Sequence, residues 1–272
     1  MLPDKIKALI LDMDGVLWKA DAPIGDLPRI FMRIRDRGLK VTFATNNGTR
    51  TPEQYVERLA GLGVAAEPWQ VVTSALGVAE LLSTRFLVTP SPLSSGEKQD
   101  MRVFAIGGAG VMSALHEKGF ELLSVEDAEK AQIVVMGIDR QINFDKMAAA
   151  ALLVRQGVPF YATNSDKTFP TPRGEIPGAG AWISVVVTAT GVEPVYAGKP
   201  APYLLDLARE RLGTEREETL VVGDRLETDI AGGQAAGMPV ALMLSGVSTR
   251  EQGQAWKPVV DMMADDLASL VD

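Results

Sequence analysis

The sequence contains no cysteine and a single histidine, His116. Without cysteine the chain can form neither a disulfide nor a thiolate metal site, and it cannot use a cysteine nucleophile. One histidine, in a helix-like stretch from Val111 to Lys118 where a solvated position is expected, is too little for a His-rich zinc site and a poor basis for a Ser-His triad. The chemistry that remains open to this composition is that of carboxylates.

Long apolar runs and an excess of positive charge are absent as well. No stretch approaches the roughly 20 apolar residues that cross a bilayer, and the N-terminus lacks a basic and then apolar signal sequence. We therefore expect a cytoplasmic protein with no membrane partner. The formal net charge of −8 argues against nucleic acid as the main partner. A small anionic substrate could still bind in a local cationic pocket.

Two carboxylates follow the first predicted strand, which spans residues 6–11. This short apolar run suits a strand buried on both faces of a parallel sheet, although a buried helix segment would look similar. Asp12 and Asp14 then fall at the carboxyl end of the strand, where ligands bind in open α/β sheets. They repel one another unless a cation such as Mg²⁺ neutralises them. The alternative is a solvated turn, because Asp and Gly are common turn residues.

Strands and helices alternate along the 272 residues, which predicts an α/β fold with parallel sheets. The outer parts, 1–77 and 179–272, are expected to form one Rossmann-like core. The block 78–178 has its own alternation and is predicted to be a second α/β domain inserted into that core. Within it, the Pro/Ser-rich segment 89–100 reads as an exposed loop. The glycines and prolines of 174–180 read as a hinge.

Further polar residues follow strands of the outer parts. Thr45 and Asn46 end the second predicted strand, Asp224 and Asp229 follow a later one, and Lys199 precedes a helix. If these strands are parallel neighbours, all of these groups gather at one sheet edge. Taken singly, each could belong to a turn, a surface loop or a helix cap. Their occurrence in this order argues against coincidence.

Such a set has the parts of a phosphoryl-transfer site, which works by positioning and by neutralising phosphate charge. Asp12, Asp224 and a backbone carbonyl near Asp14 could hold Mg²⁺ against one phosphate oxygen. Asp12 is the natural nucleophile, because an acyl phosphate splits one hard step into two. Asp14 could protonate the leaving oxygen and then take a proton from water.

The remaining phosphate oxygens need donors and a further positive charge. Thr45, Asn46 and the backbone N–H groups that follow Asp14, beginning with Gly15, are the predicted donors, helped by helix N-termini. Lys199 would add a compact ammonium.

This combination resembles the haloacid dehalogenase superfamily of aspartate-nucleophile phosphatases, and in particular its NagD-type, 4-nitrophenylphosphatase-like branch. The four motifs match at residues 12–18, 45–47, 198–200 and 223–229, so the similarity covers nearly the whole chain. The resemblance implies a Rossmann-like core with a large α/β cap between the second and third motifs. That insertion corresponds to the block 78–178.

The resemblance also implies a role for each motif residue. Asp12 is expected to be the nucleophile and a Mg²⁺ ligand, Asp14 the acid/base and a backbone ligand, and Asp224 a ligand. Asp229 would lie near Lys199. Members that lack the second aspartate tend to be dehalogenases, so Asp14 favours phosphate transfer.

One loop of the expected cap departs from the branch. Its usual Asn-Pro-Asp is here Asn164-Ser165-Asp166, and serine restores a backbone N–H. We expect Asn164 and Asp166 to influence substrate specificity. Cap-to-cap homodimers occur in this branch, so a homodimer through the cap is a further option.

The predicted function is a Mg²⁺-dependent phosphatase for a small phosphorylated metabolite. Sugar phosphates, nucleoside monophosphates, phosphoglycolate and pyridoxal phosphate all suit the branch. A phosphotransferase or mutase, or a non-catalytic phosphometabolite-binding protein, would have the same motifs. A nucleotide-cofactor protein is a weaker alternative, because the glycine cluster 107–110 has Ser113 where the dinucleotide fingerprint needs glycine. A tight turn in the cap is our interpretation of that cluster.

Overall fold

The computed structural model describes residues 2–87, 101–171 and 173–272. They form two compact units. The first unit comprises residues 2–45, 52–72 and 199–272, and the second comprises 46–51 and the described part of 73–198. The predicted loop 89–100 lies outside the described residues. None of the helices in the described ranges combines the length and apolar character of a membrane span.

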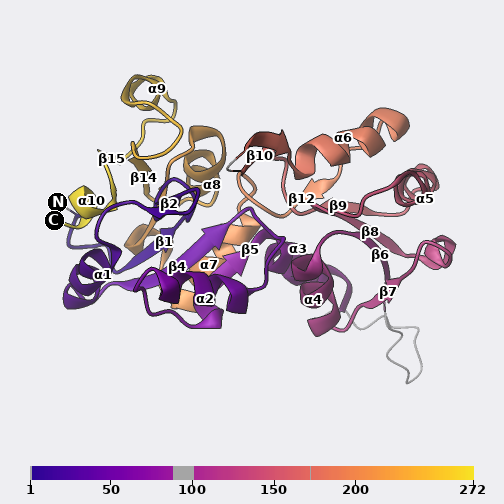
Figure 1. The fold of residues 1–272 in the computed structure, drawn as a ribbon, viewed down its shortest axis with the longest axis horizontal. Helices are drawn as coiled ribbons and strands as arrows, with labels where there is room; N and C mark the ends of the chain where they lie inside the picture. Colours follow the sequence, from indigo (N-terminus) through magenta and orange to yellow (C-terminus); the bar gives the residue numbers. More distant parts are fainter. Residues whose placement is uncertain (1, 88–100, 172) are drawn as a thin grey trace. The chain divides into compact units, whose positions relative to one another are not determined.

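The first unit is built on a parallel sheet with the strand order β15-β14-β13-β1-β4-β5 (Figure 1). Leu11, at the end of β1, is paired with Val222 of β13 and with Phe43 of β4. The chain first adds strands on one side of β1 and later on the other, so the strand order switches direction there. Ligands bind beyond the carboxyl ends of strands at such a switch point. The strands span Ala8–Leu11 (β1), Lys40–Thr45 (β4), Val71–Thr73 (β5), Thr219–Gly223 (β13), Val240–Met243 (β14) and Met262–Ala264 (β15).

Helices pack on both faces of this sheet, because its strands are apolar on both sides. Leu9 and Leu11 of β1 belong to one apolar cluster, and Ala8 and Ile10 to another. The first cluster includes α1 (Leu27–Asp36), α2 (Pro52–Gly61) and α10 (Leu267–Val271); the second includes α7 (Tyr203–Leu212) and residues flanking α8 (Ala231–Ala235). The unit also contains α9 (Arg250–Ala255) and a hairpin of β2 (Trp18–Lys19) and β3 (Ala22–Pro23), whose Trp18 belongs to the first cluster.

Local signals fix the bounds of α1. The Asp26 carboxylate accepts a hydrogen bond from the backbone N–H of Arg29, which satisfies a donor that the first turn would otherwise leave free. Gly38 follows the helix with φ of 68°, a conformation that glycine adopts without strain. Ile30 and Ile34 lie one turn apart and are both buried.

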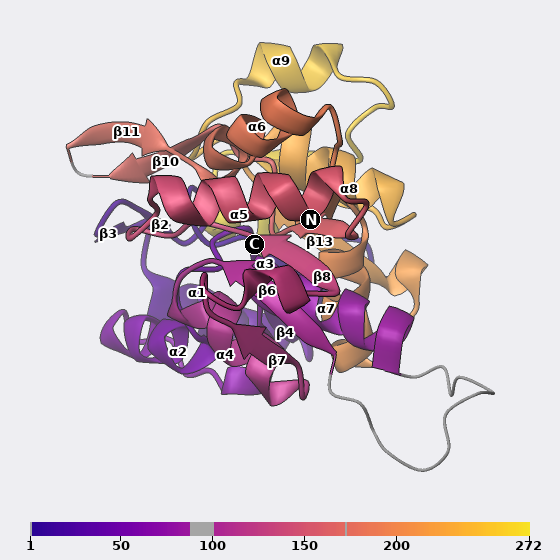
Figure 2. The ribbon, with the colours of Figure 1, turned by 90° about the vertical axis from the view of Figure 1, so that its right-hand side faces the viewer.

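The second unit repeats this layered design on a smaller parallel sheet, β12-β9-β8-β6-β7. Residues of α3 and α4 pack in one apolar cluster with the sheet, and residues of α5 and α6 in another (Figure 2). A hairpin of β10 and β11 precedes α6. The elements span Ser74–Leu82 (α3), Arg102–Ile106 (β6), Ala109–Glu117 (α4), Glu121–Leu123 (β7), Ile133–Met136 (β8), Phe144–Arg155 (α5), Phe160–Ala162 (β9), Thr168–Thr171 (β10), Gly174–Pro177 (β11), Ala179–Thr190 (α6) and Val195–Tyr196 (β12).

The glycine cluster at the end of β6 has a packing role. A Cβ on Gly110 would meet the carbonyl oxygens of Gly48 and Arg50 at 2.5 and 2.7 Å. Only glycine lets the first turn of α4 approach that backbone so closely. This geometry supports a tight turn here.

The predicted α/β class with parallel sheets is confirmed. One local prediction is wrong: the expected hinge 174–180 forms β11 and the start of α6. The contacts also place α3 and α6 in the second unit, although the predicted insertion begins at 78 and ends at 178. The division into a catalytic core and a cap is a functional one, and it stays a prediction.

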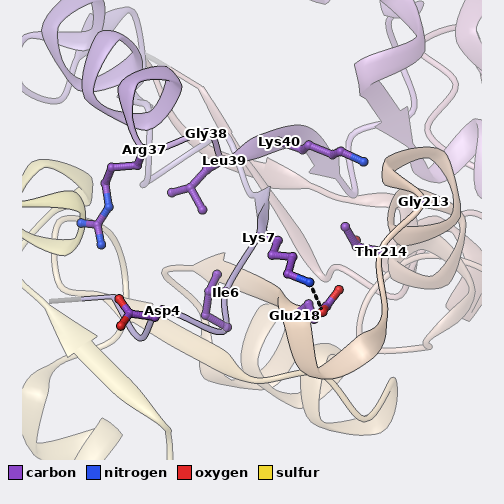
Figure 3. A pocket seen from close by; sticks show the side chains of 10 residues that line it. All are labelled: Asp4, Ile6, Lys7, Arg37, Gly38, Leu39, Lys40, Gly213, Thr214 and Glu218. Carbon is purple, nitrogen blue, oxygen red and sulfur yellow. Dashed lines mark hydrogen bonds and ion pairs between the residues drawn. The ribbon is translucent and has the colours of Figure 1, made fainter.

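A hollow of about 410 Å³ opens at the amino ends of β1, β4 and β13 (Figure 3). Lys7, Arg37, Lys40 and Glu218 of its lining are engaged with one another or with the backbone. Lys7 forms an ion pair with Glu218 at 2.5 Å, and Lys40 Nζ donates to the Leu212 carbonyl at 2.8 Å. The hollow lies at the sheet edge opposite the one that carries the predicted site.

Candidate active site

Asp12 stands directly after β1. Its backbone N–H donates to the Val222 carbonyl at 2.8 Å, which extends the pairing with β13 by one residue. The chain then turns around Met13, whose side chain is fully buried and whose carbonyl accepts the N–H of Leu17 at 2.8 Å. Because the anchored residue lies between them, Asp12 and Asp14 are both left partly exposed.

The buried ammonium of Lys199 links residues at the carboxyl ends of β1, β4 and β13. Lys199 Nζ donates to Asp12 Oδ1 and Asp229 Oδ1, both at 2.6 Å, and to the Ala44 carbonyl at 2.9 Å. Its side chain is only 3% exposed. Burial disfavours the charge, but the two carboxylates outweigh it, so the pKa of Lys199 is raised above its ordinary value. Lys199 therefore carries a positive charge.

Asp229 is fully occupied by hydrogen bonds. It lies on a single π-helical turn, Leu226–Ile230, a local geometry that is frequent at functional sites. While Oδ1 accepts from Lys199, Oδ2 accepts from the backbone N–H groups of Asp224 and Arg225 at 3.2 and 3.0 Å. Asp229 thus fixes the ammonium and the loop after β13 together.

Asp224 is the least satisfied carboxylate of the site. It is buried, with Oδ2 accepting from the Val247 N–H at 2.8 Å. Among the described residues, nothing donates a hydrogen bond to its buried Oδ1. Burial, with the neighbouring charge of Asp229, raises the pKa of Asp224 to about 7. A buried acceptor without a donor is costly unless a cation or a proton satisfies it.

The carboxylate cluster fits a divalent cation. Asp12, Asp224 and Asp229 each offer an oxygen, and these oxygens lie within 4.8 Å of one another. Burial also raises the pKa of Asp12 well above its ordinary value; Lys199 opposes this effect and Asp229 and Asp224 add to it. Hard cations such as Mg²⁺ and Ca²⁺ take such oxygen ligands. Since Asp229 is occupied, Asp12 and Asp224 are the fitting ligands.

Two glycines leave room for this carboxylate cluster. A Cβ on Gly15 or on Gly246 would overlap the Asp224 carboxylate, and Gly15 has φ of 88°. The Gly15 N–H donates to the Trp18 carbonyl at 2.7 Å, so in this structure it is not one of the predicted phosphate donors. The Gly15 carbonyl accepts from Ser245 Oγ at 2.7 Å.

Sequence reasoning missed the loop 244–248 after β14. It follows a strand of the same sheet, and this position was a usable signal, but the loop contains no carboxylate or lysine that would have drawn attention. The structure shows that it supplies the Val247 N–H to Asp224 and the Ser245 hydroxyl to Gly15.

The remaining predicted residues separate into two groups. Thr45 ends β4 and is buried in the first unit. Asn46 belongs to the second unit, where its carbonyl accepts from Asn164 Nδ2 at 2.7 Å and its Nδ2 donates to Asp166 Oδ1 at 3.2 Å. Asn164 Oδ1 in turn accepts from the Asp166 N–H at 3.0 Å. A predicted phosphate donor thus meets both predicted specificity residues.

Comparison with known proteins gives a consistent result. The profile described as haloacid dehalogenase-like hydrolase matches residues 9–121, and one described as HAD-hydrolase-like matches residues 196–270. Among relatives, the 5′-nucleotidase YutF of Bacillus subtilis is 36% identical over 245 residues, covering 90% of each chain. An acid sugar phosphatase of Staphylococcus aureus is 38% identical over 248 residues, covering 91% of this chain and 90% of its own.

Solved structures agree with this result. A p-nitrophenyl phosphatase from Archaeoglobus fulgidus matches with a TM-score of 0.86 and 30% identity over 98% of both chains. A glycerol phosphate phosphatase from Mycobacterium tuberculosis, solved in complex with calcium, matches with a TM-score of 0.86 and 33% identity over 97% of this chain and 74% of its own. The chain belongs to the haloacid dehalogenase-like hydrolase family. Within that family it is a phosphoric monoester hydrolase.

The unsatisfied oxygen of Asp224 predicts a measurable response to divalent cations. Saturating Mg²⁺ at pH 8 should raise the Tm of the wild type, because a ligand at 100 times its Kd stabilises the folded state by about 2.7 kcal/mol. Asp224→Asn should lose this rise, measured by thermal unfolding with and without chelator. Asp261→Asn is the matched control: Asp261 accepts the Val240 N–H at 2.9 Å, is not part of the carboxylate cluster and should keep the response. An equal rise in Asp224→Asn would contradict this assignment.

The raised pKa of Asp224 predicts how stability depends on pH without metal. An unfolded aspartate titrates near pH 4, whereas folded Asp224 titrates near 7. Between these values the folded state binds the extra proton, so the free energy of unfolding falls as the pH rises through this window. Urea unfolding at pH 5 and 7.5 in chelator should show a smaller fall for Asp224→Asn. Identical pH dependence in both proteins would be the contrary result.

Proposed function

We propose that the chain is a Mg²⁺-dependent phosphatase that hydrolyses a small phosphomonoester through an aspartyl phosphate on Asp12. The observation that carries the proposal is the contact of Lys199 with Asp12, beside an Asp224 oxygen that lacks a donor. In this proposal the nucleophilic carboxylate, a fixed positive charge and a cation site lie together at one sheet edge. Mg²⁺ held by Asp12 and Asp224 would supply charge neutralisation for a phosphate oxygen.

Asp12 is suited to attack phosphorus because its two oxygens differ. Oδ1 accepts from Lys199, whereas none of the described residues donates a hydrogen bond to Oδ2. An Asp12 oxygen bonds to phosphorus, the ester P–O bond breaks, and the leaving oxygen takes a proton from Asp14. Water then attacks phosphorus and gives a proton back to Asp14, and Asp12 leaves as a carboxylate.

Lys199 has two tasks in this proposal. Its ammonium holds the Asp12 carboxylate in one orientation and contributes positive charge beside the phosphate. Thr45, buried at the end of β4, is proposed as a phosphate donor, and Asn46 as a second one. Gly15 contributes room for the Asp224 carboxylate.

The names of the relatives support a substrate class. They are called a 5′-nucleotidase, an acid sugar phosphatase and a glycerol phosphate phosphatase, so we propose a small phosphorylated metabolite of this kind. The inserted unit is proposed to be a cap that excludes bulk water. Within it, Asp166 and the Asn164 that orders its backbone are proposed to tune specificity. A homodimer through the cap stays a prediction.

Phosphate release from a panel of esters with Mg²⁺ tests the proposal. Nucleoside monophosphates, sugar phosphates and glycerol phosphate should release phosphate, and chelator should stop the reaction. Asp12→Asn should lower kcat by roughly 10³-fold or more, because the nucleophile itself is lost. The matched control Asp261→Asn should retain activity. A wild type that is inert on every ester would overturn the proposal and favour a binding protein, whereas turnover only with an added acceptor would indicate a phosphotransferase.

A further inference from the structure

Asp14 is held by an indole. The Nε1–H of Trp18 donates to Asp14 Oδ1 at 2.8 Å. Asp14 and Trp18 are also joined as a β-bridge, and the Gly15 N–H donates to the Trp18 carbonyl at 2.7 Å. These contacts close the turn after β1 into a tight ring. The Asp14 side chain is thereby held at one of its two oxygens.

The indole itself has little freedom to move. Trp18 is fully buried in the same apolar cluster as β1. The guanidinium of Arg58 lies over its ring, 4.2 Å from the centroid, a separation typical of a cation–π contact. Arg58 also donates to the Ala20 carbonyl in the turn between β2 and β3. The N–H direction is therefore set by the core on one side and by α2 on the other.

This geometry makes the two oxygens of Asp14 unequal. Oδ1 faces an N–H donor, so it is an acceptor and a poor place for a proton. None of the described residues forms a hydrogen bond with Oδ2, and it is the oxygen left for a proton. A carboxylic acid that can rotate freely would present either oxygen to the leaving group.

We propose that Trp18 is a positioning residue for acid catalysis, which rests on the function proposed above. Its N–H holds Oδ1 of Asp14 so that Oδ2 carries the proton to the leaving oxygen. In that step the P–O ester bond breaks, the leaving oxygen bonds to the proton of Oδ2, and Asp14 becomes a carboxylate. Arg58 keeps the indole in place. If Trp18 served packing alone, its N–H would not be needed, because the phenyl ring of a phenylalanine is also apolar.

Two esters with different leaving groups separate positioning from packing. An alkyl phosphate such as glycerol phosphate has a basic leaving oxygen that needs a proton, whereas 4-nitrophenyl phosphate has an acidic one that does not. The parameter kcat/KM reports the first half-reaction, in which the ester bond breaks. We would measure it for both esters with the full chain, in the wild type and in Trp18→Phe.

The expected result is a selective loss. In Trp18→Phe, kcat/KM for glycerol phosphate should fall about tenfold further than for 4-nitrophenyl phosphate, a part of the 10²- to 10⁴-fold that general acid catalysis supplies. In an Asp14→Asn background, Trp18→Phe should add no further selectivity, because coupled residues are not additive. Trp256→Phe is the matched control: it also removes an indole N–H donor, here to Gln234 at 3.1 Å, and should show no selectivity.

The remaining outcomes are equally informative. Equal losses on both esters in Trp18→Phe would overturn the inference and leave a packing role. Thermal unfolding checks that the variant is folded. If it is not, Arg58→Met keeps the indole but removes the cation over it, and it should give a smaller loss of kcat/KM that again falls more heavily on glycerol phosphate. An Arg58→Met variant without this selectivity would overturn the inference. A wild type inert on both esters would instead be a failure of the proposed function.

Discussion

The buried ammonium of Lys199 is the interaction on which the rest of the site depends. Three carboxylates with oxygens within 4.8 Å of one another could not all stay ionised in a buried site without a compensating charge. Lys199 supplies it through two contacts of 2.6 Å, and the Ala44 carbonyl takes its third hydrogen bond. Removing one partner of such a buried group typically costs on the order of 3–5 kcal/mol. One ammonium does not balance three carboxylates, so the site has room for a further cation. The Asp224 oxygen that accepts no hydrogen bond from the described residues is the atom that such a cation would contact.

The fold explains why these groups meet although they lie far apart in the sequence. The strand order reverses at β1, so β4 and β13 flank it and their carboxyl ends lie beside Asp12. Asp229 then ties the loop after β13 to the ammonium, and glycines at positions 15 and 246 let the backbone close around Asp224. Trp18 completes the turn by holding Asp14. Each of the two aspartates after β1 is thus held at one oxygen, Asp12 by a cation and Asp14 by an indole.

The sequence was sufficient to predict those parts of the fold in which buried apolar residues form a clear pattern. The apolar strand predicted at residues 6–11 appears as β1, Ala8–Leu11, and Asp12, Lys199, Asp224 and Asp229 gather as predicted. The two hairpins and the edge strands β7, β12 and β15 were missed, because strands this short carry little periodicity. The loop 244–248 was missed because it acts through a backbone N–H and one hydroxyl. The meeting of Asn46 with Asn164 and Asp166 joins residues more than 100 positions apart, which no local pattern reveals.

The most direct test of the central claim is to find the phosphoryl group on Asp12. Borohydride reduces an acyl phosphate to an alcohol, which converts a phosphorylated aspartate to homoserine. The enzyme would be mixed with ester and Mg²⁺, quenched with borohydride during turnover, and mapped by peptide mass spectrometry. The account predicts homoserine at position 12, and none when chelator replaces Mg²⁺. Homoserine at another carboxylate, or an unmodified position 12 in a sample quenched during a burst of product release, would contradict it.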